Sequence, residues 1–154
     1  MNRRCFLSAA GFAVVGAAGC LDATTPATSG GVAATDFEVR DDDQMSVEAA
    51  PRVTFQSRDN QVAVRGAMYA GNPCTVATLQ SVSFQPAADH LTLTIGTKRT
   101  GDVLKRIFGC PDSLGVADFT VTVWMESTLP RSVTVTELPA GGEKQTTTVR
   151  RNSP

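Results

Sequence analysis

From residue 35 onward, the chain consists mostly of short runs in which apolar and polar residues alternate. A period of two places every second side chain on the same face, which is typical of half-buried β-strands. The apolar stripes are Phe37 and Val39; Val53 and Phe55; Val62, Val64 and Met68; Leu91, Leu93 and Ile95; Phe119, Val121, Val123 and Met125; and Val133 and Val135. Turn residues separate the runs, so we predict an all-β fold, either an antiparallel sandwich or a barrel. We favour a small antiparallel β-sandwich with an immunoglobulin-like layout.

The run from Cys74 to Phe84 changes phase part-way along. Val76, Val82 and Phe84 share one parity, and Leu79 falls on the other. A β-bulge adds one residue to a strand and so reverses the parity that faces the core. The phase change therefore predicts a bulge, or a bend between two sheets, within this run.

The segment from Gly101 to Leu114 breaks the alternation. Asp102 is placed to cap one short helical turn, and Gly109 is placed to end it. The apolar residues of that turn are Val103, Leu104, Ile107 and Phe108. We expect this segment to cross between the sheets and to be clamped to the opposite sheet by Cys110.

The first 19 residues have the layout of a secretory signal peptide. Arg3 and Arg4 form a positive head, an apolar stretch of about 12 residues follows, and small residues precede Cys20. The apolar stretch is shorter than the ~20 residues of a membrane-spanning helix. The alternatives are an uncleaved N-terminal anchor and a buried helix.

Two motifs in this leader refine the prediction. The pair Arg3-Arg4, followed after one residue by Phe6-Leu7, resembles the twin-arginine export signal, although its flanking residues also leave Sec export open. Residues 17–20 resemble a lipobox, with Ala where Leu is more usual, so Cys20 is the predicted lipidation site and membrane anchor. An ordinary signal-peptidase site is the alternative.

Residues 20–35 are predicted to form the lipidated cysteine and a flexible tether. Thr, Ser, Ala, Gly and Pro dominate this stretch, and such residues do not build a core. A tether of this length reaches on the order of 20 Å. The sandwich domain is then expected at 36–138, followed at 139–154 by an edge strand or a disordered tail.

Composition fits one small domain and excludes some partners. Of 154 residues, 42% are hydrophobic and 19% are charged, and the formal net charge is −1. From Cys20 onward there are 12 basic and 15 acidic residues, a balance that predicts neither nucleic-acid binding nor a polybasic membrane surface.

The two cysteines outside the leader and the lipobox are Cys74 and Cys110. In an exported protein, two such cysteines most simply form a disulfide. In the loop-entropy model a bridge of this span contributes ~4 kcal/mol. A redox or metal-binding thiol pair is the alternative, but neither CxxC spacing nor a neighbouring His supports it.

Several short motifs together resemble a family of small haloarchaeal lipoproteins that has no assigned activity. They are Phe37-Glu38-Val39-Arg40, Gly71-Asn72-Pro73-Cys74, Ala88-Asp89 before Leu91-Thr92-Leu93-Thr94, the second Cys, and Leu129-Pro130 before Val133-Thr134-Val135. The resemblance covers most of residues 35–138 and implies export, lipidation and a β-sandwich. The mildly acidic composition departs from a surface adapted to very high salt.

Signatures of catalysis are missing from the sequence. It contains no G-x-S-x-G, H-E-x-x-H, P-loop or dinucleotide-binding motif, so we predict no enzyme, cofactor or metal site. Asp89-His90 is expected to be a solvated turn. The run Asp41–Asp43 lacks the spacing of an EF-hand loop and is expected to be a solvated acidic loop.

The predicted function is a lipid-anchored, non-catalytic binding module of the cell envelope. Its partners would be the membrane, through Cys20, and an unidentified envelope protein or small ligand. The contact-surface candidates are Lys98, Arg99, Lys105, Arg106 and Trp124. The alternatives are an accessory subunit of a transporter or secretion assembly and, less favoured, a small extracytoplasmic enzyme.

Overall fold

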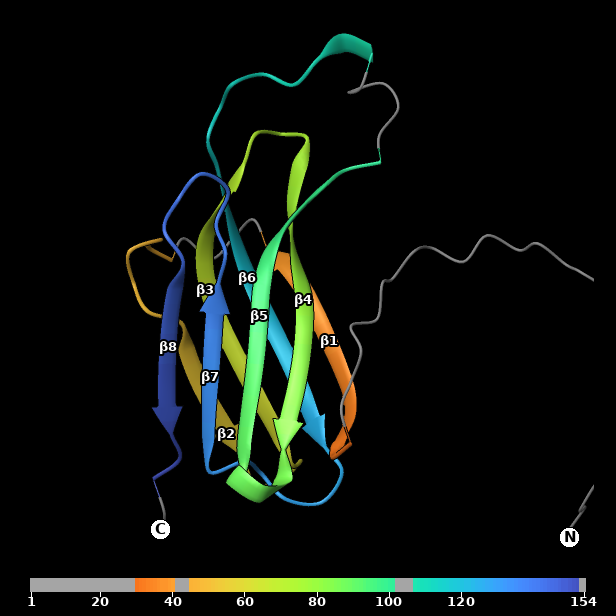
Figure 1. Cartoon of the computed structure of the whole chain (residues 1–154), viewed down its shortest axis with the longest axis vertical. Helices are drawn as coiled ribbons and strands as arrows, with labels where there is room; N and C mark the ends of the chain where they lie inside the picture. The colour runs from red at the N-terminus through yellow and green to blue at the C-terminus, as the bar shows by residue number, and fades with distance from the viewer. Residues whose placement is uncertain (1–29, 41–44, 102–106, 153–154) are drawn as a thin grey trace, which may run out of the picture.

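Eight β-strands form two sheets in the computed structural model, which describes residues 30–40, 45–101 and 107–152. The strands are β1 Val32–Arg40, β2 Arg52–Gln56, β3 Gln61–Gly71, β4 Thr75–Gln85, β5 His90–Arg99, β6 Gly115–Met125, β7 Ser132–Glu137 and β8 Gln145–Arg150, with a 3₁₀ turn at Pro86–Ala88 between β4 and β5. The two sheets pack face to face (Figure 1). This arrangement confirms the predicted β-sandwich.

The strand order is β1-β6-β3-β2 in one sheet and β4-β5-β7-β8 in the other. All neighbouring strands are antiparallel except β5 and β7, which are parallel. The alternating pattern predicts antiparallel pairing throughout. The exception arises because the chain leaves β5 for the other sheet, forms β6 there, and returns to β7 in the direction of β5.

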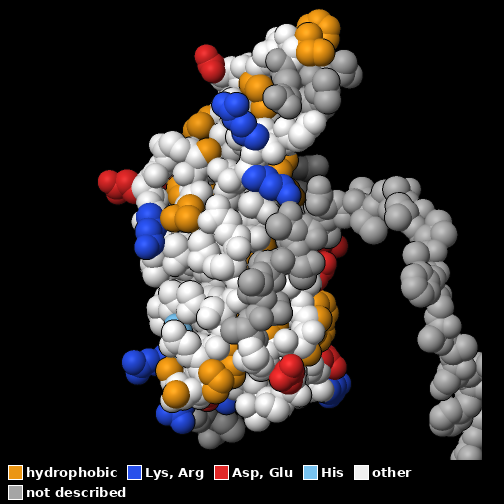
Figure 2. Space-filling view, turned by 45° about the vertical axis from the view of Figure 1, so that its right-hand side comes forward, with side chains coloured by type: hydrophobic (Ala, Val, Ile, Leu, Met, Phe, Trp, Pro, Cys, Tyr) orange, Lys and Arg blue, Asp and Glu red, His pale blue; other side chains and the backbone are white. Residues whose placement is uncertain are grey.

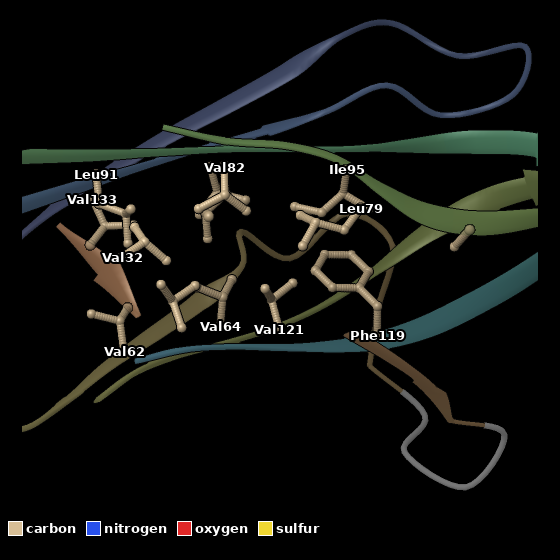
Figure 3. Packing of buried hydrophobic residues seen from close by; sticks show 14 of the residues in the cluster. Val32, Val62, Val64, Leu79, Val82, Leu91, Ile95, Phe119, Val121 and Val133 are labelled. Carbon is tan, nitrogen blue, oxygen red and sulfur yellow. The ribbon is translucent and has the colours of Figure 1, made fainter. Parts of the chain in front are cut away.

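The core lies between the sheets and is built from the predicted stripes. The fully covered side chains, at 0% exposure, are Val62, Val64, Leu91, Leu93, Ile95, Val121, Val123, Val133 and Val135. Figure 3 shows several of them pointing toward one another from the two sheets. Full burial of a Val, Leu or Ile side chain contributes about 1.5–3 kcal/mol, so these stripes are the main source of stability.

Phe119 of β6 is the largest fully buried side chain, and it requires a glycine opposite. Gly66 of β3 is its partner in the ladder. A Cβ at Gly66 would lie 2.6 Å from Cζ of Phe119, so only glycine allows the ring to approach the backbone this closely. On β1, Phe37 stacks on Phe119 with 6.3 Å between ring centroids.

The predicted phase change in β4 is a register shift between Leu79 and Ser81. Before the shift Ala77 and Leu79 are buried, and after it Val82 is buried. Val76 shares the sequence parity of the buried Val82, but it is 37% exposed. The extra residue at the bulge reverses the parity, which puts Val76 on the outer face.

The sandwich extends beyond its predicted limits at both ends. Strand β1 begins at Val32, which is buried, inside the predicted tether. Strand β8 pairs with β7 along its whole length, and Thr134 and Thr148 on these strands join their hydroxyls at 2.7 Å. Residues 139–154 therefore contain an edge strand.

The helical turn predicted in the segment from Gly101 to Leu114 lies mainly on residues 102–106, outside the described residues. Ile107 and Phe108 are helical, and Gly109 has φ of +80°, a conformation that commonly ends a helix. The remaining residues to Leu114 lead into β6 without regular structure. In the described part of the chain, no helix is long and apolar enough to cross a membrane.

The two ends of the sandwich are formed by different connecting segments. The near end comprises Gly31 and the connections 57–60, 86–89 and 126–131; the distal end comprises 70–75, 107–115 and 138–144 (Figure 1, bottom and top). Backbone hydrogen bonds join the near-end segments. They run from the N–H of Met125 to Asn60, of Glu126 to Gly31, of Arg131 to Asp89 and of Arg151 to Arg131, at 2.8, 3.0, 2.9 and 2.8 Å.

Candidate functional site: the distal apolar surface

Large hydrophobic side chains that remain exposed gather at the distal end. Those that are at least 36% exposed among the described residues are Val39, Tyr69, Val76, Ile107, Phe108, Leu114 and Val116. Tyr69 is opposite Val116 at the distal end of the β3–β6 ladder, and Val76 is opposite Lys98 at the distal end of the β4–β5 ladder. We call these seven residues the distal apolar surface.

The crossover between β5 and β6 supplies the most exposed members. Phe108 is 84% exposed, Ile107 69% and Leu114 66%. Figure 2 shows hydrophobic side chains at the tip of the projection that rises above the sandwich. Because these side chains stay in water, they add little to folding. Large exposed apolar patches are often found at interaction sites.

A disulfide holds this crossover against the sandwich. Cys74, which is buried, precedes β4 by one residue, and Cys110 follows Phe108 by two; their Cα atoms are 5.8 Å apart. The structure contains the pairing expected from the sequence. The bridge joins two crossovers, β3 to β4 and β5 to β6, at one end of the molecule, instead of clamping the segment to the face of the opposite sheet.

The β3–β4 connection fixes the position of Cys74. Gly71 has φ of +91°, a conformation that glycine adopts without strain. The side-chain oxygen of Asn72 accepts a hydrogen bond from the N–H of Cys74 at 3.0 Å, and the hydroxyl of Thr75 donates to the carbonyls of Asn72 and Ala70. These hydrogen bonds and the glycine conformation hold Cys74 in position to bond to Cys110 of the crossover.

A shallow hollow lies beside the exposed side chains. Its volume is about 220 Å³, and its lining includes Val39, Val76, Val116, Ala70 and Ala117. Small-molecule sites are typically about 300–1,000 Å³. The hollow therefore fits one or two side chains of a protein partner better than it fits a complete small ligand.

The contact residues predicted from the sequence do not form one surface. Lys98 and Arg99 end β5 at the distal end and are exposed. Trp124 lies at the near end of β6, in register with Gln61 of β3 and Ala34 of β1, and is partly covered. Lys105 and Arg106 lie outside the described residues. Lys98 and Arg99 thus border the distal apolar surface, and Trp124 does not.

The predicted solvated turn at Asp89-His90 lies at the near end. Nδ1 of His90 is 2.7 Å from the hydroxyl oxygen of Ser132, its partner across the β5–β7 pair. Asp89 has φ of +50°, and its carbonyl accepts the N–H of Arg131. The contacts of this pair tie β5 to β7. The acidic run Asp41–Asp43 lies outside the described residues.

Two carboxyl groups in the described residues are buried. Asp118 is 9% exposed, and its Oδ1 accepts a hydrogen bond from the N–H of Met45 at 3.2 Å. Glu137 is 4% exposed, and its Oε1 has no hydrogen-bond partner. Burial raises the pKa of Glu137 from its usual 4.5 to about 7. Within the described ranges, no group of three or more His, Cys, Asp or Glu is arranged to hold a metal ion.

None of the seven residues of the distal apolar surface was predicted from the sequence as a contact residue, although one signal was present. The core residues of β6 have odd numbers, from Ala117 to Met125, and Val116 has the other parity. That parity predicts an outward side chain on a half-buried strand. The same signal marks Glu137 as inward-facing, because it shares the parity of Val133 and Val135.

Comparisons of this chain with protein-family models, with curated proteins and with solved structures each find no match.

Proposed function

We propose that this chain is an exported lipoprotein whose sandwich binds another envelope protein through the distal apolar surface, without catalysing a reaction. The leader with Arg3, Arg4, Phe6 and Leu7 and the lipobox ending at Cys20 support export and anchoring. The disulfide also fits an oxidising compartment.

The observation that carries the proposal is that the chain enters the sandwich at one end and the exposed apolar residues lie at the other. The chain enters the sandwich at the near end, where the carbonyl of Gly31 accepts the N–H of Glu126. The 11 residues of β6 separate the two ends by ~35 Å at 3.3 Å per residue. A tether from Cys20 therefore leaves the distal apolar surface free to meet a partner away from the anchor.

The chemistry of the surface indicates the kind of partner. Exposed Phe108, Ile107 and Leu114 offer the apolar and aromatic contacts that are enriched at the centres of protein interfaces. Lys98 and Arg99 add positive charge at the edge. The complementary partner is a protein with an apolar depression and acidic residues around it.

Affinity capture from native membranes tests the binding proposal. The bait is the full chain, compared with an Ile107→Ser/Phe108→Ser variant and with a control variant, Ala87→Ser/Ala88→Ser, altered at exposed near-end positions. We expect the wild type and the control to retain the same partner and the distal variant to lose it. Equal capture by all three would contradict the proposal, and a partner that co-migrates stoichiometrically on a native gel would indicate the accessory-subunit alternative.

Intact-mass measurement of protein from its native membrane tests the anchor separately. We expect a species that begins at Cys20 and is heavier by a lipid, with thiols that alkylate only after reduction. A mass that includes Arg3 and Arg4, or one that begins at Cys20 without lipid, would contradict the anchoring proposal.

A further inference from the structure

A second surface, unrelated to the distal end, opens along one side of the sandwich. Strand β2 ends one sheet and β8 ends the other, and Figure 1 shows both on the same side of the molecule. Between them lies an open groove of about 660 Å³, lined by residues of β2 and by the end of β8. This volume is within the ~300–1,000 Å³ of typical ligand sites. On the opposite side, the ring of Phe84 in β4 packs over Gly31 beside β1.

The groove combines an apolar wall with two free strand edges. Val53 and Phe55 from β2 and Val149 from β8 line it, and all three are only half-buried. Within the described part of the chain, β2 pairs with β3 alone and β8 with β7 alone. The outer backbone N–H and C=O groups of both strands are therefore available to an added strand, which is a recurrent mode of peptide recognition.

Positive charge lies at one end of the groove. Arg150 and Arg151 are the charged residues among the described ones that line it. Ser57 also lines the groove, and the exposed Arg58 follows it in the sequence. The acidic residue closest to Ser57 in the sequence is Asp59. A ligand that ends in carboxylates matches this charge, and arginine binds carboxylates with strong, directed hydrogen bonds.

We propose that this groove binds an extended peptide segment of a partner protein, which adds to the free edge of β8. Its alternate apolar side chains pack between Val53, Phe55 and Val149, and its acidic end lies at Arg150 and Arg151. Five residues of β2 correspond to ~17 Å of extended chain, so a segment of five to eight residues fits. This site goes beyond the distal apolar surface and is independent of it.

Fluorescence anisotropy with the detergent-solubilised full chain tests this proposal. The probe is a labelled octapeptide that alternates Thr and Val and ends in two Asp residues. One comparison peptide ends in two Lys, and another has alternate backbone nitrogens methylated so that they cannot pair with a strand edge. We expect saturable binding of the acidic peptide and at least roughly tenfold weaker binding of both comparison peptides. The Lys peptide loses its charge-assisted hydrogen bonds to the arginines, and the methylated peptide loses its backbone hydrogen bonds to the strand edge.

Matched variants locate the site. Arg150→Gln/Arg151→Gln should weaken binding of the acidic peptide by roughly tenfold or more, and Lys98→Gln/Arg99→Gln at the distal end should leave it unchanged. Thermal unfolding of each variant verifies that it is folded, as expected for exposed or partly exposed side chains. No saturable binding up to about 1 mM, equal binding of the Asp and Lys peptides, or displacement by anionic phospholipid vesicles would overturn the proposal. The vesicle result would assign the arginines to a membrane surface. None of these results depends on the lipid anchor or on Phe108.

Discussion

The near and distal ends of the sandwich are built in different ways. At the near end, backbone hydrogen bonds link neighbouring loops, as from Arg131 to Asp89 and from Arg151 to Arg131. At the distal end, backbone hydrogen bonds also join Thr100 to Cys74 and Ala140 to Tyr69, but the crossover that carries Phe108 is fastened by a disulfide. Within residues 107–114, the backbone hydrogen bond outside the sheets is a local one, from Ser113 to Pro111.

In the proposed function, this difference assigns stability to the near end and contact to the distal end. Among the described residues, seven large hydrophobic side chains are at least 36% exposed, and all seven belong to the distal apolar surface and none to the near-end segments. Apolar side chains in water do not stabilise the fold. In the proposed function, the disulfide holds these side chains in place for a partner, since a preformed surface loses less entropy on binding.

The largest expected contrast is in the loss of unfolding free energy when a leucine is replaced by alanine inside the core and on the distal apolar surface. Leu93→Ala removes a side chain with 0% exposure, and Leu114→Ala removes one that is 66% exposed. Chemical denaturation should show a loss of about 2–5 kcal/mol for Leu93→Ala and of no more than about 0.5 kcal/mol for Leu114→Ala. A loss of unfolding free energy above about 1.5 kcal/mol for Leu114→Ala would mean that Leu114 is packed against the fold and is not an exposed contact residue.

Removal of the disulfide should produce the next effect. The bridge spans 36 residues, and the Cys74→Ser/Cys110→Ser variant should lose about 2–4 kcal/mol of unfolding free energy. Limited proteolysis should then cut within 107–114 before it cuts the near-end loops. Cleavage that begins at the near end in this variant would show that the bridge does not hold the crossover.

Glu137 supplies a pH-dependent test inside the sandwich. Its pKa is about 7 in the folded protein and 4.5 in its usual state, so between these values the folded state binds the proton and the unfolded state releases it. Unfolding free energy should therefore fall as pH rises from 5 to 7, by at most about 3 kcal/mol from this group. Denaturation of the wild type and of Glu137→Gln at pH 5 and pH 8 isolates the effect. The variant should lose less stability across this range, and identical losses would contradict the raised pKa.

The sequence predicts the sandwich well because alternation directly reports which side chains face inward. Leu91, Leu93 and Ile95 are fully buried, as their stripe predicts. Alternation does not report which strands are neighbours, so the parallel pairing of β5 with β7 was not expected. The bulge in β4 was visible in the sequence as a phase change. The outward position of Val76 became clear only from the pairing register of β4 with β5.

The surfaces were harder to predict because they depend on the assembled strands. Phe108 and Ile107 have the same chemistry as core residues, and only their place on a projecting crossover exposes them. The groove beside Val149 exists because β2 and β8 are both edge strands and lie on the same side of the molecule, which depends on strand order and on how the two sheets pack. Trp124 has the residue type of a binding residue, yet it lies at the near end.

Site-specific photocrosslinking in native membranes tests the central claim most directly. One protein carries a photoreactive residue in place of Phe108 at the distal end, and another carries it in place of Ala87, which is exposed at the near end. If the distal apolar surface is the binding site, Phe108 should yield a discrete crosslinked protein and Ala87 should not. Crosslinks of equal yield from both positions, or from Ala87 alone, would contradict the claim.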